Sequence, residues 1–492
     1  PGAKYDASGN AGIINIRLKK NKKFGTNGSA SLGLIQGKSV KGNGGINLNY
    51  RDKKVNVFGN ISGADGHWEN NQAIDRIQRD TLYNQLSKSI SHNKGMNGKA
   101  GADFFIHKRH TLGLLVTAGV ADYSWKNEST TDIFRQGNAV PDKILAARNT
   151  INGQRTNITS NINYRYADTS GLEINVDADY ALYRADSKSY QPNFYKDGEG
   201  KDLYEVINRN VTPTNIDIYT IKADAEMNKW KGKLGFGVKS AYVVTENVFD
   251  IYRDIAGVPV KNLAASNSFR YVENVNAAYI NFSKELHPKL SFQAGLRMEH
   301  TMSEGRLIRA DGQQQDDEHI RKNYVNLFPS MAATLKMNRQ HSFGLTYSRR
   351  IDRPGYRNLN PFENKLDELT YQKGNAFLKP QFGNNLEFSH VFKGKLTTTF
   401  GYNDVSDFIS EYLDTTNGNA TYVQQRNLAR QQMLTLSVST SFKVMRWWNV
   451  YVSAHGNHQS LQGRVVLLDI YKTINSYGSY VQNSFTLGKN YT

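Results

Sequence analysis

Hydrophobic and polar residues alternate along extended stretches of this chain. In residues 172–180, one side of an extended strand would carry Leu172, Ile174 and Val176. The other side would carry Glu173 and Asn175, followed by two aspartates. Residues 290–299 and 434–442 repeat the pattern. Because successive side chains of a β-strand point to opposite faces, the alternation predicts strands with one apolar and one polar face.

Short turns and longer polar connections alternate between the predicted strands. Tight turns are expected at residues 51–54, 107–109, 168–171, 231–233, 287–289, 338–340, 393–395 and 444–446. Longer polar connections are expected at residues 63–91, 126–151, 187–212, 248–267, 303–320, 351–382, 406–425 and 459–476. In an up-and-down meander this order puts all tight turns at one rim and all long connections at the other. Outer-membrane barrels have this arrangement, with short periplasmic turns and long external loops.

The pattern therefore predicts an all-β fold, a large antiparallel up-and-down transmembrane β-barrel. Counting from Asn27 gives about 18 strands, many of them longer than the roughly 9–11 residues that cross a bilayer. Trp447 and Trp448, beside a tight turn, fit an interfacial aromatic girdle. The first and last strands, near residues 29–35 and 480–487, are expected to leave two unpaired sheet edges.

The composition and charge of the chain exclude further classes of protein. The chain has 492 residues, no cysteine and a net charge of +18. Its Lys and Arg residues are scattered and form no basic helix or nucleic-acid-binding signature, so a solvated surface explains the charge and no nucleic-acid partner is expected. No run of about 18 apolar residues predicts a membrane-spanning helix. A soluble basic binding protein is a further possible class, but the sorting of short and long connections to opposite rims argues against it.

The sequence contains no catalytic constellation and its eleven histidines show no metal-ligand spacing, so we expect neither an enzyme nor a bound cofactor or metal. The carboxylates of residues 316–318 beside His319 suit a solvated external loop better than a metal site, since such a loop does not hold its ligands in place. Aromatic side chains in the long connections offer rigid surfaces on which a ligand could stack. The candidates for ligand contact are Trp68, Trp125, Tyr190, Phe194 and Tyr195.

The N-terminal stretch of residues 5–16 is a glycine-punctuated turn that runs into a short β-branched strand. Such a piece fits inside a large sheet that curls around it. It resembles the end of the plug domain of TonB-dependent receptors of Gram-negative outer membranes, and is closest to the barrels common in Bacteroidetes-type bacteria. The resemblance rests on Tyr5, Gly9, Gly12, Ile14, Asn15 and Ile16.

A second stretch, in the middle of the predicted barrel, is similar to the loop of the same family in which an Arg-Pro element precedes a Gly-Asn-Pro-x-Leu-Lys-Pro sequence. Ala376 stands where that loop usually has proline. The matching residues, called here the signature loop, are Arg350, Arg353, Pro354, Asn360, Pro361, Gly374, Asn375, Leu378, Lys379 and Pro380.

The resemblance implies a barrel of about 22 strands filled by an N-terminal plug. Residues 1–23 would then be the C-terminal end of the plug domain, and residues 24–492 a C-terminally incomplete transmembrane barrel with about four strands still to follow. On that expectation the chain alone would bind a ligand without importing it.

The resemblance also implies a function. It is uptake of a scarce or large nutrient (an iron chelate, cobalamin, a glycan or a peptide) by TonB-coupled plug movement in the outer membrane of a Gram-negative bacterium. The implied partners are outer-membrane lipid, a periplasm-spanning energy-transducing protein and a ligand at the external loops. The alternative is a passive or adhesive outer-membrane barrel without energy coupling.

Overall fold

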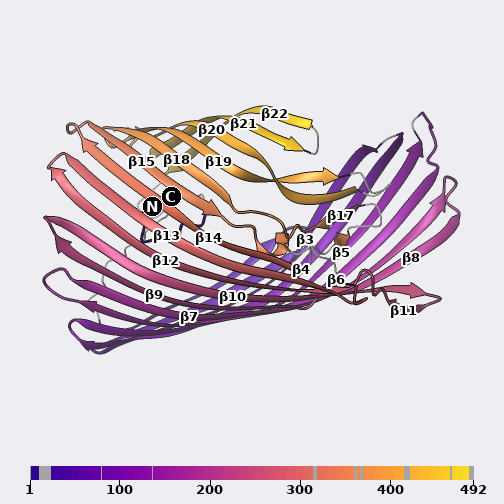
Figure 1. Cartoon of the computed structure of the whole chain (residues 1–492), viewed down its shortest axis with the longest axis horizontal. Coiled ribbons are helices and arrows are strands. Elements are labelled where there is room, and N and C mark those ends of the chain that lie inside the picture. Colours follow the sequence, from indigo (N-terminus) through magenta and orange to yellow (C-terminus); the bar gives the residue numbers. More distant parts are fainter. Residues whose placement is uncertain are drawn as a thin grey trace.

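The computed structural model describes residues 2–9, 24–78, 80–135, 137–313, 319–359, 363–365, 370–414, 421–465 and 468–486. The strands named in these ranges belong to a single sheet that curls into a deep arc (Figure 1). Consecutive wall strands pair antiparallel, as in an up-and-down barrel. The helical structure within the described ranges lacks the length and apolar character that crossing a membrane requires.

Of the 22 named strands, four are short pieces within connections, which leaves the predicted number of about 18 strands in the wall. The wall strands are β1 (Gly25–Gln36), β2 (Val40–Arg51), β3 (Val55–Gln78), β4 (Thr81–His107), β5 (His110–Arg135), β6 (Lys143–Ala167), β7 (Glu173–Asp197), β9 (Thr214–Lys229), β10 (Gly232–Ile255), β12 (Asn267–His287), β13 (Leu290–Arg309), β14 (His319–Lys336), β15 (His341–Asp352), β18 (Gln381–Phe392), β19 (Leu396–Asp414), β20 (Thr421–Met445), β21 (Trp448–Val465) and β22 (Leu468–Phe485). The short pieces are β8 (Asp202–Val211), β11 (Val258–Lys261), β16 (Glu363–Lys365) and β17 (Thr370–Lys373), and one short helix, α1, covers Tyr356–Leu359.

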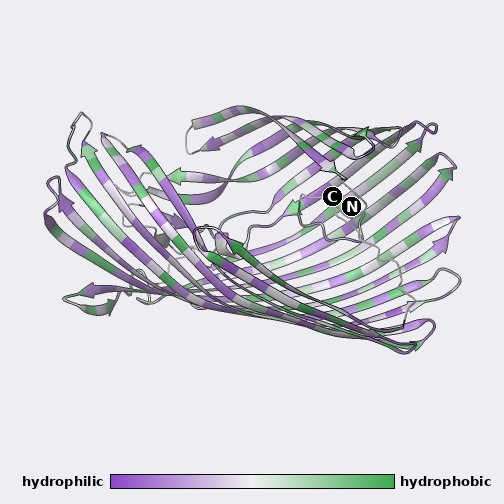
Figure 2. Cartoon of the chain, turned by 180° about the vertical axis from the view of Figure 1, so that it is seen from behind, coloured by the Kyte–Doolittle hydropathy of each residue, from purple (hydrophilic) through white to green (hydrophobic). Residues whose placement is uncertain are grey.

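The two faces of the wall follow the predicted alternation. On β13, Leu296 and Met298 face outward and are 43% and 45% exposed. The alternate residues Arg297 and Glu299 face inward and are only 2% and 3% exposed. Figure 2 shows the alternation as green and purple segments along the strands. An apolar outer face and a polar inner face are what a barrel needs in lipid.

The tight turns fall where the sequence predicts them. All eight predicted positions lie at or within a residue of the junction between two wall strands, from β2–β3 to β20–β21. The β9–β10 turn places Trp230 and Lys231 at φ values of 52° and 58°, the left-handed conformation of a two-residue hairpin turn. We call this edge of the wall the short-turn rim, and the opposite edge the long-hairpin rim.

The prediction of loops at the long-hairpin rim is wrong for most of these segments. Residues 63–91 continue as β3 and β4, which pair without a break as far as Gln78 and Thr81. Residues 187–197 likewise continue β7, and β8 returns beside them. Polar alternation without turn residues keeps the antiparallel ladder going beyond the apolar part of the strands, because a paired ladder satisfies the backbone in water as well as in lipid.

Outward-facing aromatic rings mark both limits of the apolar face. On the long-hairpin side, the rings of Tyr180 and Tyr219 lie 5.0 Å apart, and those of Tyr219 and Tyr242 lie 6.5 Å apart. The Arg184–Asp217 ion pair, at 2.8 Å, follows them directly. A tyrosine row beneath an ion pair is the expected composition of a lipid–water boundary.

The aromatic pair predicted for the short-turn rim is present beside the β20–β21 turn. The rings of Trp447 and Trp448 lie 6.4 Å apart, and Phe485 on β22 lies 5.8 Å from Trp448. Trp447 is 45% exposed. This arrangement agrees with the interfacial girdle expected there.

The arc has two free edges in the described part of the chain. β1 pairs only with β2, and β22 pairs only with β21. No ladder between described residues joins β1 to β22. The sequence predicted unpaired edges at these two strands, and the structure confirms them.

Candidate functional site

The N-terminal segment, residues 2–9, is attached to the inner edge of β15. Ile351 donates its N–H to the carbonyl of Ala7 at 3.0 Å, and Gly9 donates its N–H to the carbonyl of Ile351 at 3.0 Å. Ser8 and Ile351 thereby form a parallel β-bridge. Gly9 has a φ of 93°, a left-handed conformation that favours glycine. The segment is therefore held to β15 by a single bridge.

The edge of β15 is free at this place because β14 leaves it. β14 pairs with β15 only from Ser330 to Lys336, and the next residue along β14, Pro329, has no N–H to donate. The segment also approaches β13 closely: a Cβ added to Gly295 would lie 2.8 Å from the Cβ of Ala3. Glycine at position 295 makes room for the segment.

Asp6 anchors the segment electrostatically. Its carboxylate accepts hydrogen bonds from Lys239 Nζ at 2.7 Å and from Arg297 Nη2 at 2.9 Å. Arg350 Nη1 donates to the backbone carbonyl of Asp6 at 2.6 Å. Burial raises the pKa of Asp6, but the hydrogen bond and charge of Lys239 and the charge of Arg297 outweigh it, and the pKa lies below its ordinary value. Asp6 is thus held ionised.

Glu299 connects this anchor to the signature loop. It accepts hydrogen bonds from Arg297 Nε at 2.6 Å and, with its other oxygen, from Arg353 Nη2 at 2.8 Å. Its first oxygen also lies 3.4 Å from the N–H of Ala7. Arg353 donates in addition to Thr301 Oγ1 at 3.0 Å. A chain of charged contacts therefore runs from the N-terminal segment to the first residue after β15.

The described residues of the signature loop between Pro354 and Pro380, which follow β15 and precede β18, lie on the inner side of the wall. Leu378 is fully buried, in a cluster with Phe269, Tyr271 and Leu359. The carbonyl of Leu378 accepts a hydrogen bond from Lys322 Nζ. Hydrogen bonds made by the rest of the loop include those from Asn375 N to Asn358 O at 2.6 Å, from Asn375 Nδ2 to Gln425 O at 3.1 Å, from Gln424 Nε2 to Gly374 O at 3.0 Å, and from Lys379 N to Asn427 Oδ1 at 2.8 Å.

Two cavities on the inner face lie against this loop. The larger, about 730 Å³, is bounded by β10, β12 and β13 on one side and by residues 373–377 on the other. The smaller, about 460 Å³, is lined by Tyr123, Tyr183, Tyr356, Asn247 and other uncharged side chains, together with Lys373. Residues 373 and 374 line both cavities. The inner site thus consists of two hollows separated by the signature loop.

The family of the chain follows from comparison with known proteins. Residues 165–492 match the model of the outer membrane protein beta-barrel family.

The chain belongs to this family.

A solved structure with a TM-score above 0.5 agrees with this membership at the level of fold. The chain is similar to a double mutant of the Serratia marcescens hemophore receptor HasR in complex with its hemophore HasA and heme, with a TM-score of 0.52 and 12% identity over 96% of this chain and 76% of that one. It is also similar to the siderophore receptor PirA from Pseudomonas aeruginosa (TM-score 0.47, 12% identity, 96% of this chain, 76% of that one) and to the RagAB peptide importer (0.46, 11%, 87%, 51%). No curated protein sequence matches the chain.

As a member of the outer membrane protein beta-barrel family, the chain is a protein of the Gram-negative outer membrane. Its resemblance to the TonB-dependent receptors is confirmed for the fold.

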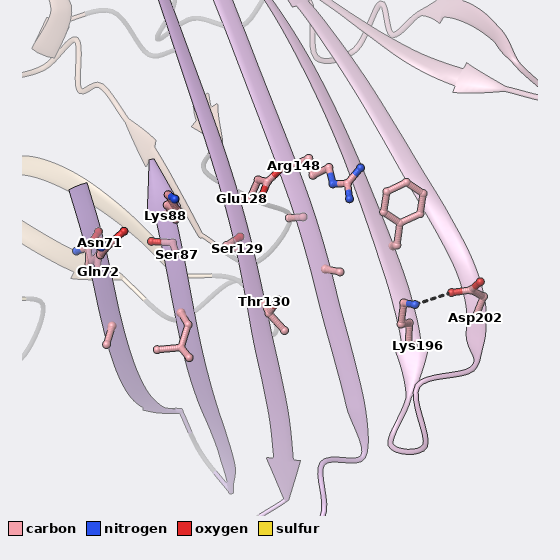
Figure 3. Close-up of a pocket in the computed structure, with 15 residues that line it drawn as sticks. Asn71, Gln72, Ser87, Lys88, Glu128, Ser129, Thr130, Arg148, Lys196 and Asp202 are labelled. Atoms are coloured by element: carbon pink, nitrogen blue, oxygen red, sulfur yellow. Dashed lines mark ion pairs between the residues drawn. The ribbon is translucent and has the colours of Figure 1, made fainter. Parts of the chain in front are cut away.

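The five aromatic candidates lie on different faces of this family member. Trp68 and Trp125 both stand opposite Ser91 in the β3–β4–β5 ladder and share the inner face. Tyr195 also faces inward and is 8% exposed, packed with Leu145. Tyr190 and Phe194 face outward, and Phe194 lines a hollow of about 870 Å³ near the long-hairpin rim, beside the Lys196–Asp202 ion pair (Figure 3).

Several predicted residues lie outside the described ranges: Gly12, Ile14, Asn15 and Ile16 of the N-terminal stretch, Asn360 and Pro361 of the signature loop, and the carboxylates of residues 316–318. Tyr5 is described and is 37% exposed. Sequence reasoning did not single out Asp6, Arg297 or Glu299 as site residues. The sequence did contain a signal for them: Arg297 and Glu299 are charged residues on the inward face of a strand, and Asp6 is a charged residue within a family motif.

Proposed function

We propose that this barrel is an outer-membrane receptor that takes up a scarce or large nutrient by energy-coupled movement of its N-terminal segment. In this proposal residues 2–9 are the end of a plug, and the partners are outer-membrane lipid and a periplasm-spanning energy-transducing protein. The observation that carries the proposal is the network of Asp6, Arg297, Glu299 and Arg353. This network joins two parts of the protein. One is the N-terminal segment, on which the energy-transducing protein would pull, and the other is the signature loop, which lines the inner cavities.

The cavities supply the ligand site. The smaller one is lined by tyrosines, threonines, asparagines and glutamines, and Lys373 is the single charged residue among its described lining residues. Thr245 in its wall is 1% exposed, and its hydroxyl has no hydrogen-bond partner within the described ranges. Tyrosine rings with neutral hydrogen-bonding groups suit a hydroxyl- or amide-bearing ligand, so a glycan or peptide fits better than an anionic iron chelate.

The network is suited to pass a signal. Arg353 directly follows β15 and opens the signature loop, so a ligand that shifts the loop also shifts the partner of Glu299. Because Glu299 and Arg297 are almost fully buried, loss of one contact leaves a charge that water does not compensate. A ligand can then favour release of the N-terminal segment, provided that it binds the shifted loop more tightly.

The test uses fluorescent maltooligosaccharides, oligopeptides and a ferric chelate as probes, in cells that produce the receptor in a host with its own energy-transducing system. We expect glycan or peptide to accumulate and an uncoupler of the proton gradient to stop accumulation. Arg353→Ala should keep surface binding and lose uptake at least tenfold. Arg349→Ala, on the outward face of β15, is the matched control. Uptake that the uncoupler leaves unchanged would favour the passive or adhesive alternative.

A further inference from the structure

Three metal-ligating side chains lie together on the β3–β4 hairpin, far from the inner site. Asp65 and His67 are two residues apart on β3 and therefore share a face of the sheet. His92 on β4 is the direct cross-strand partner of His67. The ligand atoms of the three side chains lie within 4.8 Å of one another. It is the one such cluster among the residues that the structure describes.

The geometry of the cluster is close to that of a three-ligand metal site. The imidazole rings of His67 and His92 are parallel, with centroids 4.0 Å apart. His92 Nε2 lies 2.7 Å from Asp65 Oδ1. Tetrahedral coordination with metal–ligand bonds of about 2.0–2.1 Å requires ligand atoms about 3.3 Å apart. The three side chains would have to rotate on the two-strand backbone to reach that spacing.

The cluster lies in water at the edge of the lipid-facing surface. Outward residues of β5 are apolar up to Val120 and become polar at Asp122. Asp122 stands opposite Lys94, which in turn stands opposite Asp65. Lys94 is thus the cation directly opposite Asp65 in the ladder, and Asp122 stands on the other side of Lys94. Asp65 and His67 are exposed, so an ion in the medium has direct access.

We propose that Asp65, His67 and His92 form an external binding site for one divalent transition-metal ion such as Zn²⁺. Two imidazoles and one carboxylate are the donors that Zn²⁺, Ni²⁺ and Cu²⁺ accept, whereas Mg²⁺ and Ca²⁺ prefer oxygen ligands alone. Three protein ligands leave at least one coordination position open to water or to a donor group of another molecule. The site is separate from the proposed uptake path and does not depend on it.

The test is titration of the purified full chain, stripped of metal and kept in detergent micelles, with ZnCl₂ in excess Mg²⁺ by calorimetry. We expect one Zn²⁺ per chain. Changing even residues that only support a metal ligand lowers affinity about 10–100-fold, so His67→Ala and His92→Ala should each weaken binding at least tenfold. Asp65→Asn should weaken it too. Heat-dependent gel mobility confirms that each variant is folded.

The matched control is His390→Ala. His390 on β18 and His341 on β15 are diagonal neighbours in the ladder, with ring nitrogens 2.9 Å apart and rings stacked, but they do not belong to a three-ligand cluster. This change should leave Zn²⁺ affinity unaltered. The proposal is overturned if the unaltered chain binds no Zn²⁺, or if His390→Ala lowers the affinity as much as His67→Ala.

Discussion

Arginine substitutions on neighbouring residues of β7 test which face of the wall meets lipid. Val176 lies midway between the turn at residues 168–172 and Tyr180, and it is 36% exposed on the outward face. With a rise of about 3.3 Å per residue and a tilt of about 40°, it is about 10 Å from each boundary. Arginine near the midplane of a barrel costs about 2–4 kcal/mol, so Val176→Arg should lower the free energy of unfolding by that amount.

Two nearby positions provide comparisons for the destabilisation expected from Val176→Arg. Ile174 is also outward but about 5 Å nearer the short-turn rim, so Ile174→Arg should cost less than Val176→Arg because its guanidinium reaches the interface. Asn175 faces inward, opposite Arg165 on one side and Asp224 on the other. Asn175→Arg should be nearly neutral, since its side chain enters a polar lumen.

The assay is urea unfolding of the full chain in lipid vesicles, followed by tryptophan fluorescence. The expected order of destabilisation is Val176→Arg, then Ile174→Arg, then Asn175→Arg. If Asn175→Arg destabilises the protein as much as Val176→Arg, the assignment of the inner and outer faces of β7 is wrong.

Other parts of the structure give four further predictions. Protease added to intact cells should cut the hairpin at residues 198–201 and spare Lys231 until the outer membrane is opened; early cleavage at Lys231 would reverse the two rims. Glu299→Ala should lower the free energy of unfolding in urea by about 3–5 kcal/mol, because the buried Arg297 and the partly buried Arg353 each lose one carboxylate partner; an unchanged value would remove Glu299 from the network. Asp6 has a lowered pKa, so its stabilisation is present above its ordinary pKa of 3.8 and is lost as the pH falls through the folded-state value; a fluorophore on the N-terminal segment should report acid release there, and Asp6→Asn should abolish the acid step. Leu378→Ala should cost about 2–5 kcal/mol in the same urea assay, and a cost below about 0.5 kcal/mol, typical of surface sites, would mean that the loop is not packed.

The faces and turns of the wall could be predicted because they depend on neighbouring residues. Alternation separates Leu296 from Arg297 whatever the rest of the chain does, and a strand reversal leaves its turn residues in the sequence. The ends of the long hairpins could not be read in this way. A polar strand outside the bilayer and a polar loop have similar compositions, and backbone pairing alone distinguishes them.

The candidate site was predictable in part. Arg350 and Arg353 belong to a recognisable motif, and both join the network. Their partners are distant in sequence: Asp6 and Arg297 are 291 residues apart. An inward charged residue looks the same in the sequence whether it meets water or a partner. The aromatic candidates failed to gather for a related reason, since the face of Tyr190 depends on a register that sequence alone does not fix.

The continuous ladders of the long hairpins restrict how this protein can change in length during evolution. A residue inserted into one strand of β3–β4 turns every later side chain of that strand to the opposite face, and the ladder must absorb it as a bulge. One residue added to each strand at the very tip keeps the existing pairs and lengthens the ribbon. We therefore expect relatives of this chain to differ at the hairpin tips by equal numbers of residues in the two strands. The positions of Asp65, His67 and His92 relative to one another in the sheet should survive such changes in hairpin length.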